Sequence, residues 1–187
     1  MPLAAGAYRA GPDTGSLVVR TLREGAAARA GHDLVLEVTR WEAAVQLAGD
    51  LADSTIALSA DPASLVVREA SGGVKPLSDG DREQIDGVIR GKVLRDRPIA
   101  FRSTGVRPSA GGLHVEGELG LAGGTHPVTV RVELRSDGTV SAAVPLDQTD
   151  WGIRPYRALM GALRVRDRVE VTVETRLVGT PGTEPGG

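Results

Sequence analysis

Apolar and polar residues alternate along residues 31–47 for longer than in any other part of the chain. Alternate side chains lie on the same face of a β-strand, so this pattern predicts a strand with one apolar face. The apolar residues are Leu34, Leu36 and Val38 before Arg40, and Trp41, Ala43, Val45 and Leu47 after it. The apolar residues therefore change from even-numbered to odd-numbered positions at Arg40. A shift of one residue turns side chains to the other face, so we predict a β-bulge or a short break near Arg40–Trp41.

Shorter segments with the same alternation follow along the chain, separated by turns rich in Gly, Pro and Asp. The expected strands include residues 16–22, 54–59, 99–103, 113–121, 126–134, 140–146 and 169–173. About eight to ten short antiparallel strands joined by tight turns are typical of a β-barrel or a β-sandwich. The long, bulged strand suits a strongly curved sheet or barrel, because bulges bend a sheet.

The period changes from two to 3.6 over residues 80–94, where the apolar residues form one stripe and the other positions are charged. This pattern predicts an amphipathic helix inserted among the strands. Ser78 or Asp79 can cap its first turn. Gly87 and Gly91 weaken the helix, and they indicate either close packing on the barrel or a helix that moves.

A length of 187 residues suits one domain with a sizeable core. We place this domain at residues 1–178 and predict that the Gly- and Pro-rich segment 179–187 is a disordered tail. A second short helix is expected at residues 156–161. The predicted fold is therefore mainly β, with one inserted amphipathic helix and a second short one.

Composition narrows the functional classes. The net charge of -2 does not favour a nucleic-acid partner, and the absence of cysteine excludes disulfides and thiolate metal sites. Residues 1–8 have neither the basic nor the apolar region of a signal peptide, and no run of 18 apolar residues follows. We therefore expect a cytoplasmic protein that does not span a membrane.

His32 and Asp33 are the best candidates for chemistry. Adjacent residues of a strand face opposite sides, so the two do not easily form one catalytic dyad. The main expectation is that Asp33 bonds to nearby backbone while His32 lies at the surface or at the rim of the barrel. His114 and His126 lack the spacing of a metal site, and the chain contains neither a Gly-x-Ser-x-Gly segment nor a phosphate-binding loop. No metal or cofactor is therefore expected.

Arginines form the only local basic cluster, which consists of Arg154, Arg157, Arg164, Arg166 and Arg168. Guanidinium groups at a barrel mouth can bind a pyrophosphate or carboxylate head bidentately. The alternative is a solvated surface balanced by neighbouring acidic residues. Trp151 and Tyr156 bracket residues 152–155 at the start of this cluster, and they either plug or gate one end of the barrel.

Three segments taken together resemble the YceI-like family of polyisoprenoid-binding proteins. The first is Pro-Ile-Ala-Phe-Arg-Ser at 98–103, directly after the predicted helix. The second runs from a Gly-x-Leu strand through a Gly-Thr turn to Pro-Val, over 116–128. The third is Asp-Trp-Gly-Ile at 150–153, followed by the strand at 169–171. The resemblance extends over about residues 6–178.

The resemblance implies an extended antiparallel β-barrel, similar to lipocalins, that encloses an elongated apolar tunnel. Members hold long isoprenoid chains, such as polyprenyl phosphates or quinone tails, and often form homodimers; no shared catalytic constellation is implied. The positions expected to contact a ligand are Leu36, Val38, Trp41, Phe101, Leu119, Val128, Val130, Val144, Trp151 and Tyr156. The candidate head-group or rim residues are His32, Arg154 and Arg157.

The leading hypothesis is a non-enzymatic protein that binds, transports or sequesters a lipophilic, isoprenoid-like molecule inside the barrel. Burial of apolar surface would drive binding at roughly 25 cal/mol per Å². One alternative is an enzyme that acts on a bound lipophile through His32 or Asp33. The other is a stress-related scaffold without a ligand, which predicts a barrel filled by its own side chains.

Overall fold

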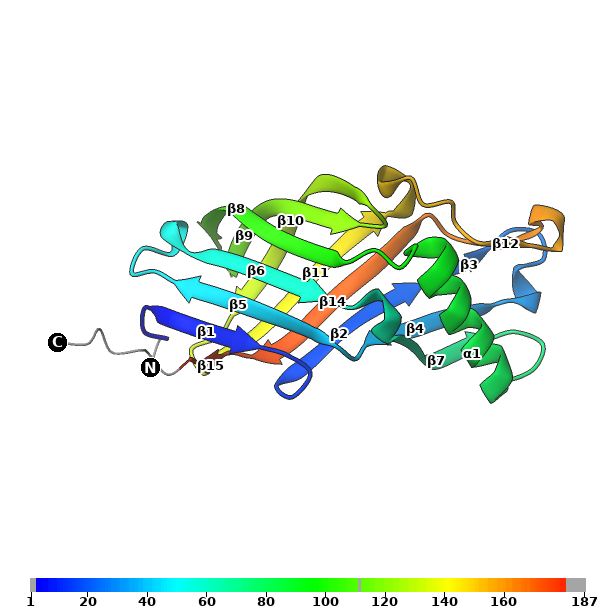
Figure 1. Ribbon diagram of the computed structural model, residues 1–187, viewed down its shortest axis with the longest axis horizontal. Helices are drawn as coiled ribbons and strands as arrows, with labels where there is room; N and C mark the ends of the chain where they lie inside the picture. Colours follow the sequence, from blue (N-terminus) through cyan, green and yellow to red (C-terminus); the bar gives the residue numbers. More distant parts are fainter. Residues whose placement is uncertain (1–2, 111, 181–187) are drawn as a thin grey trace.

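The computed structural model describes residues 3–110 and 112–180, and it is an elongated, mainly β molecule with one helix at one end (Figure 1). The strands are β1 (Gly6–Ala10), β2 (Gly15–Thr21), β3 (Arg23–Glu24), β4 (His32–Val38), β5 (Trp41–Leu47), β6 (Thr55–Ala60), β7 (Leu65–Gly72), β8 (Ile99–Ser109), β9 (Gly112–Leu121), β10 (Gly124–Leu134), β11 (Thr139–Asp147), β12 (Arg157–Ala158), β13 (Leu163–Val165), β14 (Arg168–Arg176) and β15 (Val178–Gly179).

The main sheet is antiparallel and 12-stranded, in the order β15-β1-β5-β6-β8-β9-β10-β11-β14-β2-β4-β7. Because β14 continues through Leu177 into β15, and β15 pairs with β1, the two flanks of the sheet meet at the end that carries the chain termini (Figure 1). At the other end the sheet remains a half-barrel whose last strand is β7. The predicted mainly β, barrel-like fold with an inserted helix is confirmed.

The predicted break lies between β4 and β5. Ser64, which is 1% exposed, holds the backbone at this break through two hydrogen bonds. Its carbonyl oxygen accepts from the Thr39 N–H at 3.0 Å, and its hydroxyl oxygen accepts from the Arg40 N–H at 3.0 Å. The chain then passes from the neighbourhood of β2 and β7, which pair with β4, to that of β1 and β6, which pair with β5. Apolar residues of opposite parity therefore both face the interior.

The inserted helix is α1 (Asp79–Val88), which continues as a π-helical turn over Ile89–Val93. Ser78 caps it in a capping box with Asp81, because each of the two residues accepts the backbone N–H of the other. Gly87 and Gly91 do not pack closely on the barrel, because a Cβ placed at either position meets no described atom within 4 Å apart from the neighbouring backbone of its own helix. Close packing is therefore not the reason for these glycines.

Two expectations near the C-terminus are corrected. In place of a helix at 156–161, the chain forms the two-residue strand β12 and a short 3-10 turn over Leu159–Gly161, where Leu159 and Met160 have φ of 49° and 52°. A left-handed backbone ends a right-handed helix. The expected tail 179–187 is ordered at its first two residues, because Gly179 belongs to β15 and the Thr180 N–H donates to the Ala7 carbonyl oxygen. Residues 181–187 lie outside the described chain.

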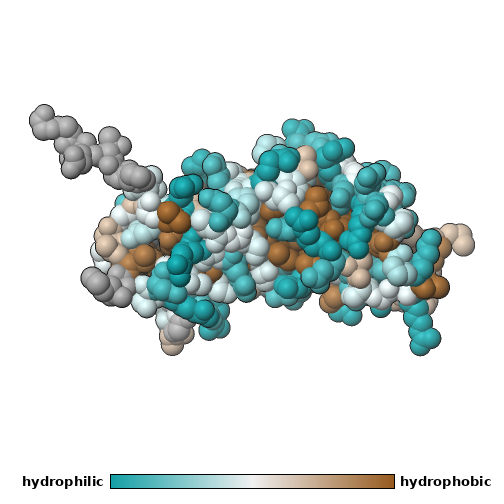
Figure 2. Space-filling model, turned by 90° about the horizontal axis from the view of Figure 1, so that it is seen from below, coloured by the Kyte–Doolittle hydropathy of each residue, from teal (hydrophilic) through white to brown (hydrophobic). Residues whose placement is uncertain are grey.

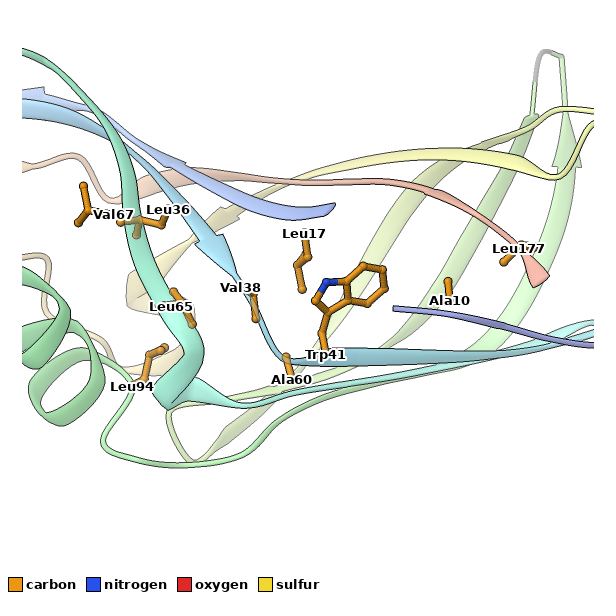
Figure 3. Close-up of a cluster of buried hydrophobic side chains, with 10 residues drawn as sticks. All are labelled: Ala10, Leu17, Leu36, Val38, Trp41, Ala60, Leu65, Val67, Leu94 and Leu177. Carbon is orange, nitrogen blue, oxygen red and sulfur yellow. The ribbon is translucent and has the colours of Figure 1, made fainter. Parts of the chain in front are cut away.

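Apolar side chains from strands on both sides of the break form the largest buried cluster (Figure 3). In this cluster the indole ring of Trp41 projects from the start of β5 between Leu17 and Ala10. The cluster does not fill the interior, and the space that it leaves open forms the candidate site.

Candidate ligand-binding cavity

Two cavities open inside the described part of the chain. The distal cavity, of about 190 Å³, lies toward the end with the chain termini and is lined by β5 and β8–β11, among other strands. The proximal cavity, of about 460 Å³, lies beneath α1 and is lined by β2, β4 and the helix. Leu17, Leu119, Leu146 and Val171 line both cavities. The two cavities therefore adjoin as successive parts of one interior space, which we call the tunnel.

The strand β14 follows the tunnel along its length. Its inward residues are Val169, Val171, Val173 and Thr175, of which the first two line the proximal cavity and the last three line the distal one. At roughly 3.3 Å per residue, these positions span about 20 Å. The tunnel is therefore long and narrow rather than round.

The distal cavity is almost wholly apolar. Among its described lining residues, the side chains with a polar atom are Ser54, Thr175 and Trp41. The Ser54 hydroxyl accepts from the Ala48 N–H at 3.0 Å, and the Thr175 hydroxyl shares a hydrogen bond with the Thr14 hydroxyl at 3.0 Å. Each of these hydroxyl oxygens therefore already takes part in one hydrogen bond.

Trp41 is the one polar side chain of this cavity without a hydrogen bond among the described residues. It is 6% exposed, and its indole Nε1–H is buried with no hydrogen-bond acceptor among the described residues. The other tryptophan, Trp151, is equally buried, but its Nε1–H donates to the Leu119 carbonyl oxygen at 2.9 Å. A buried donor without a partner costs about 1–3 kcal/mol.

The proximal cavity becomes polar toward its outer end. The polar residues that line it are Thr21, Arg23, His32, Asp81, Gln84, Gln148, Tyr156 and Arg164. We call this set the polar mouth. It combines guanidinium, imidazole, amide, hydroxyl and carboxyl groups next to an apolar interior, which suits an amphipathic ligand.

Arg23 and His32 approach the backbone of the adjacent β7 turn closely. Gly72 and Gly73 have φ of 81° and 75°, and a Cβ at either position would collide with the Arg23 guanidinium or the His32 ring. The Arg23 Nη1 donates to the Ser71 carbonyl oxygen at 2.8 Å. These glycines therefore allow the two side chains to occupy the mouth.

His32 and Asp33 are not joined as a dyad. The His32 Nε2–H donates to the Lys75 carbonyl oxygen at 2.9 Å, since a carbonyl oxygen can only accept. Asp33 accepts from the Arg23 backbone N–H at 2.8 Å, and its carboxylate lies 3.7 Å from the Arg23 guanidinium. His32 lines the proximal cavity, whereas Asp33 is not among its described lining residues.

Asp81 brings a carboxylate to the mouth from the first turn of α1. The Ser78 hydroxyl donates to it at 2.7 Å and the Ser78 backbone N–H at 2.9 Å, and these bonds hold the pKa of the Asp81 carboxyl below its ordinary value of 3.8. Lys75 and His32 act in the same direction by their charge. Asp81 is therefore ionised at neutral pH, opposite the cationic Arg23 and Arg164 in the same mouth.

The helix α1 covers the proximal cavity with one of its faces. Asp81, Gln84, Ile85, Val88 and Ile89 line the cavity, at the i, i+3, i+4, i+7 and i+8 positions of a single helical face. On its flank, α1 binds the edge of the half-barrel through two of its polar side chains.

Those two side chains satisfy the outer backbone groups of β7. The Asp86 carboxylate accepts from the Val67 N–H at 3.1 Å, and the Arg82 Nη1 donates to the Val67 carbonyl oxygen at 3.2 Å. An edge strand exposes such groups unless another element covers them. The helix therefore takes the place of a further strand at this edge.

Exposed apolar side chains surround the polar mouth. Leu22, Val74, Tyr156, Leu159 and Met160 are all exposed, and they belong to segments next to β3, α1 and β12. Figure 2 shows apolar side chains at this end of the molecule, on the face seen from below. The mouth is therefore polar at its centre and partly apolar around it.

Most residues expected to contact a ligand face the tunnel. Trp41, Phe101, Val128, Val130 and Val144 line the distal cavity; Leu36, Val38, Tyr156 and His32 line the proximal cavity; Leu119 lines both. Trp151, Arg154 and Arg157 are not among the described lining residues of either cavity. Trp151 instead packs in a separate cluster with Ala122, Leu146 and Ile153.

The sequence pattern did not single out Arg23, a cationic residue that lines the proximal cavity. Leu17, Val19 and Thr21 share one face of β2, and Arg23 continues their parity beyond the strand into the proximal cavity. Extending the alternation into polar residues would have identified it. Arg164 was noted only as part of the basic cluster; it lines the mouth and binds Glu24 at 2.7 Å.

Comparison with known proteins gives a consistent picture. The family model of the YceI-like domain matches residues 21–177. The crystal structure of BcnA from Burkholderia cenocepacia is similar at a TM-score of 0.62 and 16% identity, covering 88% of this chain and 96% of BcnA. A mutant CJ YceI protein with a monobromobimane guest is similar at 0.57 and 10%, covering 79% of this chain and 85% of that one. A second mutant of the CJ protein is similar at a TM-score of 0.58 and 10% identity, covering 79% of this chain and 85% of that one.

At these identities the crystal structures support the fold alone. Comparison with curated protein sequences found no match. The family assignment therefore rests on the domain model, which spans most of the sequence.

Proposed function

This chain belongs to the YceI-like family, and from that premise we propose that it binds one isoprenoid-like lipophile inside the tunnel without transforming it. The family is known for polyisoprenoid-binding proteins, which supports lipophile binding in general. The ligand classes that we consider are polyprenyl phosphates, quinones and related chains. Transport or sequestration of such a molecule requires only that the barrel bury it and release it.

One observation carries this proposal: two adjoining apolar cavities run along β14 and end at a polar mouth. Each CH₂ group buried in such a space gains about 0.8 kcal/mol. A chain molecule can therefore offset the cost of being ordered, while polar groups at the mouth fix its orientation.

The geometry favours binding over the two alternatives. An enzyme that acts through His32 or Asp33 would need a free acid or base at the bound molecule, but Asp33 is not among the described lining residues and the Nε2–H of His32 already donates to the Lys75 carbonyl oxygen. A scaffold without a ligand would have a filled interior, whereas here cavities of about 190 and 460 Å³ adjoin. The scaffold alternative does not account for the continuous apolar lining.

Mass spectrometry of the purified protein tests the proposal. The native mass is measured first, then the masses released by organic solvent, and then the native mass after addition of a polyprenyl phosphate or an isoprenoid quinone. We expect one lipophile for each chain, either retained from the cell or taken up from the mixture. A bare protein that takes up none of these molecules would contradict lipophile binding.

Two further expectations stay predictions. Homodimer formation and a cytoplasmic location were inferred from the family resemblance and from residues 1–8. Within the described part of the chain, none of the helices has the length and apolar character needed to cross a membrane. Size-exclusion chromatography with light scattering would measure the oligomeric state.

A further inference from the structure

We infer that the ligand carries a neutral oxygen acceptor, such as a carbonyl or ether oxygen, that binds the indole N–H of Trp41 inside the tunnel. This inference rests on the proposed function and specifies the chemistry of the molecule bound. It begins from the one buried side-chain donor that lacks an acceptor among the described residues.

Trp41 brings its donor to the wall of the tunnel, but the nitrogen itself exposes less than 1 Å² of surface, so a ligand oxygen reaches it when the ring or a neighbouring side chain shifts. The residue lines the distal cavity, and its indole nitrogen lies on the side of the ring nearest Leu17 (Figure 3). Leu17 lines both cavities. The N–H is therefore located close to the passage between them, about midway along the tunnel rather than at its mouth.

A buried water molecule does not explain this donor well. An ordered internal water needs two to four polar partners, and apolar cavities remain dry. The other polar side chains of the distal cavity, Ser54 and Thr175, already bond to Ala48 and Thr14. A water at Trp41 would thus find few partners besides the indole, whereas a ligand oxygen would be held there by the burial of the rest of the molecule.

The surroundings also determine the charge of the acceptor. Apart from Trp41, Ser54 and Thr175, the described side chains that line the distal cavity are apolar. A phosphate or carboxylate there would lose its hydration without a cation to pair with, which is far more costly than burying a carbonyl group. A charged group of the ligand therefore belongs at the polar mouth, beside Arg23 and Arg164, and the acceptor at Trp41 is neutral.

The chain supplies an internal reference for the test, because it contains two tryptophans. A ¹H–¹⁵N correlation spectrum of the labelled protein therefore shows two indole signals, and Trp41→Phe assigns them by removing one. The probes are long-chain ketones, with the carbonyl near the end or in the middle of the chain, and the alkane of the same length. Native mass spectrometry establishes that each probe is bound.

We expect a bound ketone to move the Trp41 indole proton downfield, as hydrogen bonding does, and the bound alkane to leave it without that shift. Loss of one neutral hydrogen bond weakens binding about three- to tenfold. Trp41→Phe should therefore weaken ketone binding by about that factor and leave alkane binding nearly unchanged. Trp151→Phe is the matched control, because that indole already donates to Leu119 and the ketone preference should survive.

The outcomes separate this inference from the proposed function. If ketones and alkane bind equally well, or if every ketone binds without the downfield shift, the acceptor at Trp41 is refuted while lipophile binding stands. If none of the probes or isoprenoid lipids binds, the proposed function fails, and this inference fails with it. The spectrum of the unmodified protein decides the matter even if Trp41→Phe does not fold, because Trp151→Phe then assigns the two indole signals by removing the other one.

Discussion

Phe101, the only phenylalanine of the chain, lies against a glycine of the neighbouring strand. A Cβ added at Gly117 would come within 2.5 Å of both the Phe101 ring and the Arg102 carbonyl oxygen. The missing side chain leaves room for the ring, which lines the distal cavity. At the residue scale, the shape of the tunnel therefore depends on small side chains as much as on large ones.

We expect Gly117→Ala to lower the free energy of unfolding by about 1–3 kcal/mol, because the backbone at Arg102 cannot move away without disturbing β8. Urea denaturation measures the change. Gly87→Ala is the matched control: its Cβ meets no described atom within 4 Å, and alanine in a helix should stabilise by about 0.5–1 kcal/mol. Equal effects of the two substitutions would contradict the close contact at Gly117.

The helix α1 is the element that separates the proximal cavity from solvent along β7. It contributes no buried residue, and the two glycines within its helical region meet open space. Its attachment combines the partly buried Ile85 and Ile89 with Arg82 and Asp86, which bond to the backbone of β7. An element with few fully buried apolar contacts opens at low free-energy cost. We therefore expect the helix to control release of the ligand.

Arg82→Ala should accelerate dissociation of a fluorescent fatty acid about three- to tenfold, because the bonds to Val67 and Arg68 are lost. Stopped-flow displacement by excess unlabelled lipid measures the rate. Arg90→Ala removes a charge from the π-helical turn that follows α1, at a residue that binds only the exposed Asp96 among the described acidic groups, and should leave the rate near that of the unmodified protein. Equal rates for both variants would mean that release follows another route.

The whole molecule is a curved sheet whose two ends differ. At the end with the termini, β15 and β1 join the flanks and the cavity is apolar; at the end with α1, the sheet is open and the cavity ends in polar groups. The residues common to both cavities, Leu17, Leu119, Leu146 and Val171, form the passage between them. Whether a ligand uses one cavity or both depends on this passage.

We expect Val171→Phe to narrow the passage, so that a long isoprenoid chain loses at least tenfold in affinity, roughly the loss of two buried CH₂ groups or more. A short chain that fits the proximal cavity should lose much less. Competition against a fluorescent lipid gives both affinities. Glu174→Phe, on the exposed outer face of the same strand, controls for the tolerance of β14 and should alter neither affinity. Equal losses for short and long chains would contradict a ligand that spans the passage.

The sequence by itself determined the alternation, the reversal of parity at Arg40 and the capped amphipathic helix. These features depend on neighbouring residues, since side-chain parity and helix caps are local properties. The resemblance to the YceI-like family was likewise visible in local segments, and the domain model bears it out. The expectation of a helix at 156–161 was wrong because Leu159 and Met160 have left-handed backbone, and the local sequence carries no clear signal of that conformation.

Only the tertiary structure decided which polar groups meet the tunnel. Arg23 enters the mouth because Gly72 makes room for it, although the two residues lie far apart in the sequence. Arg154 and Arg157, which the sequence suggested as head-group residues, are exposed and are not among the described lining residues of the tunnel. Trp41 and Trp151 are alike in sequence terms, but whether an indole N–H finds an acceptor depends on strands brought together by folding. Long-range pairing therefore sets the chemistry of the site, while local pattern sets the fold.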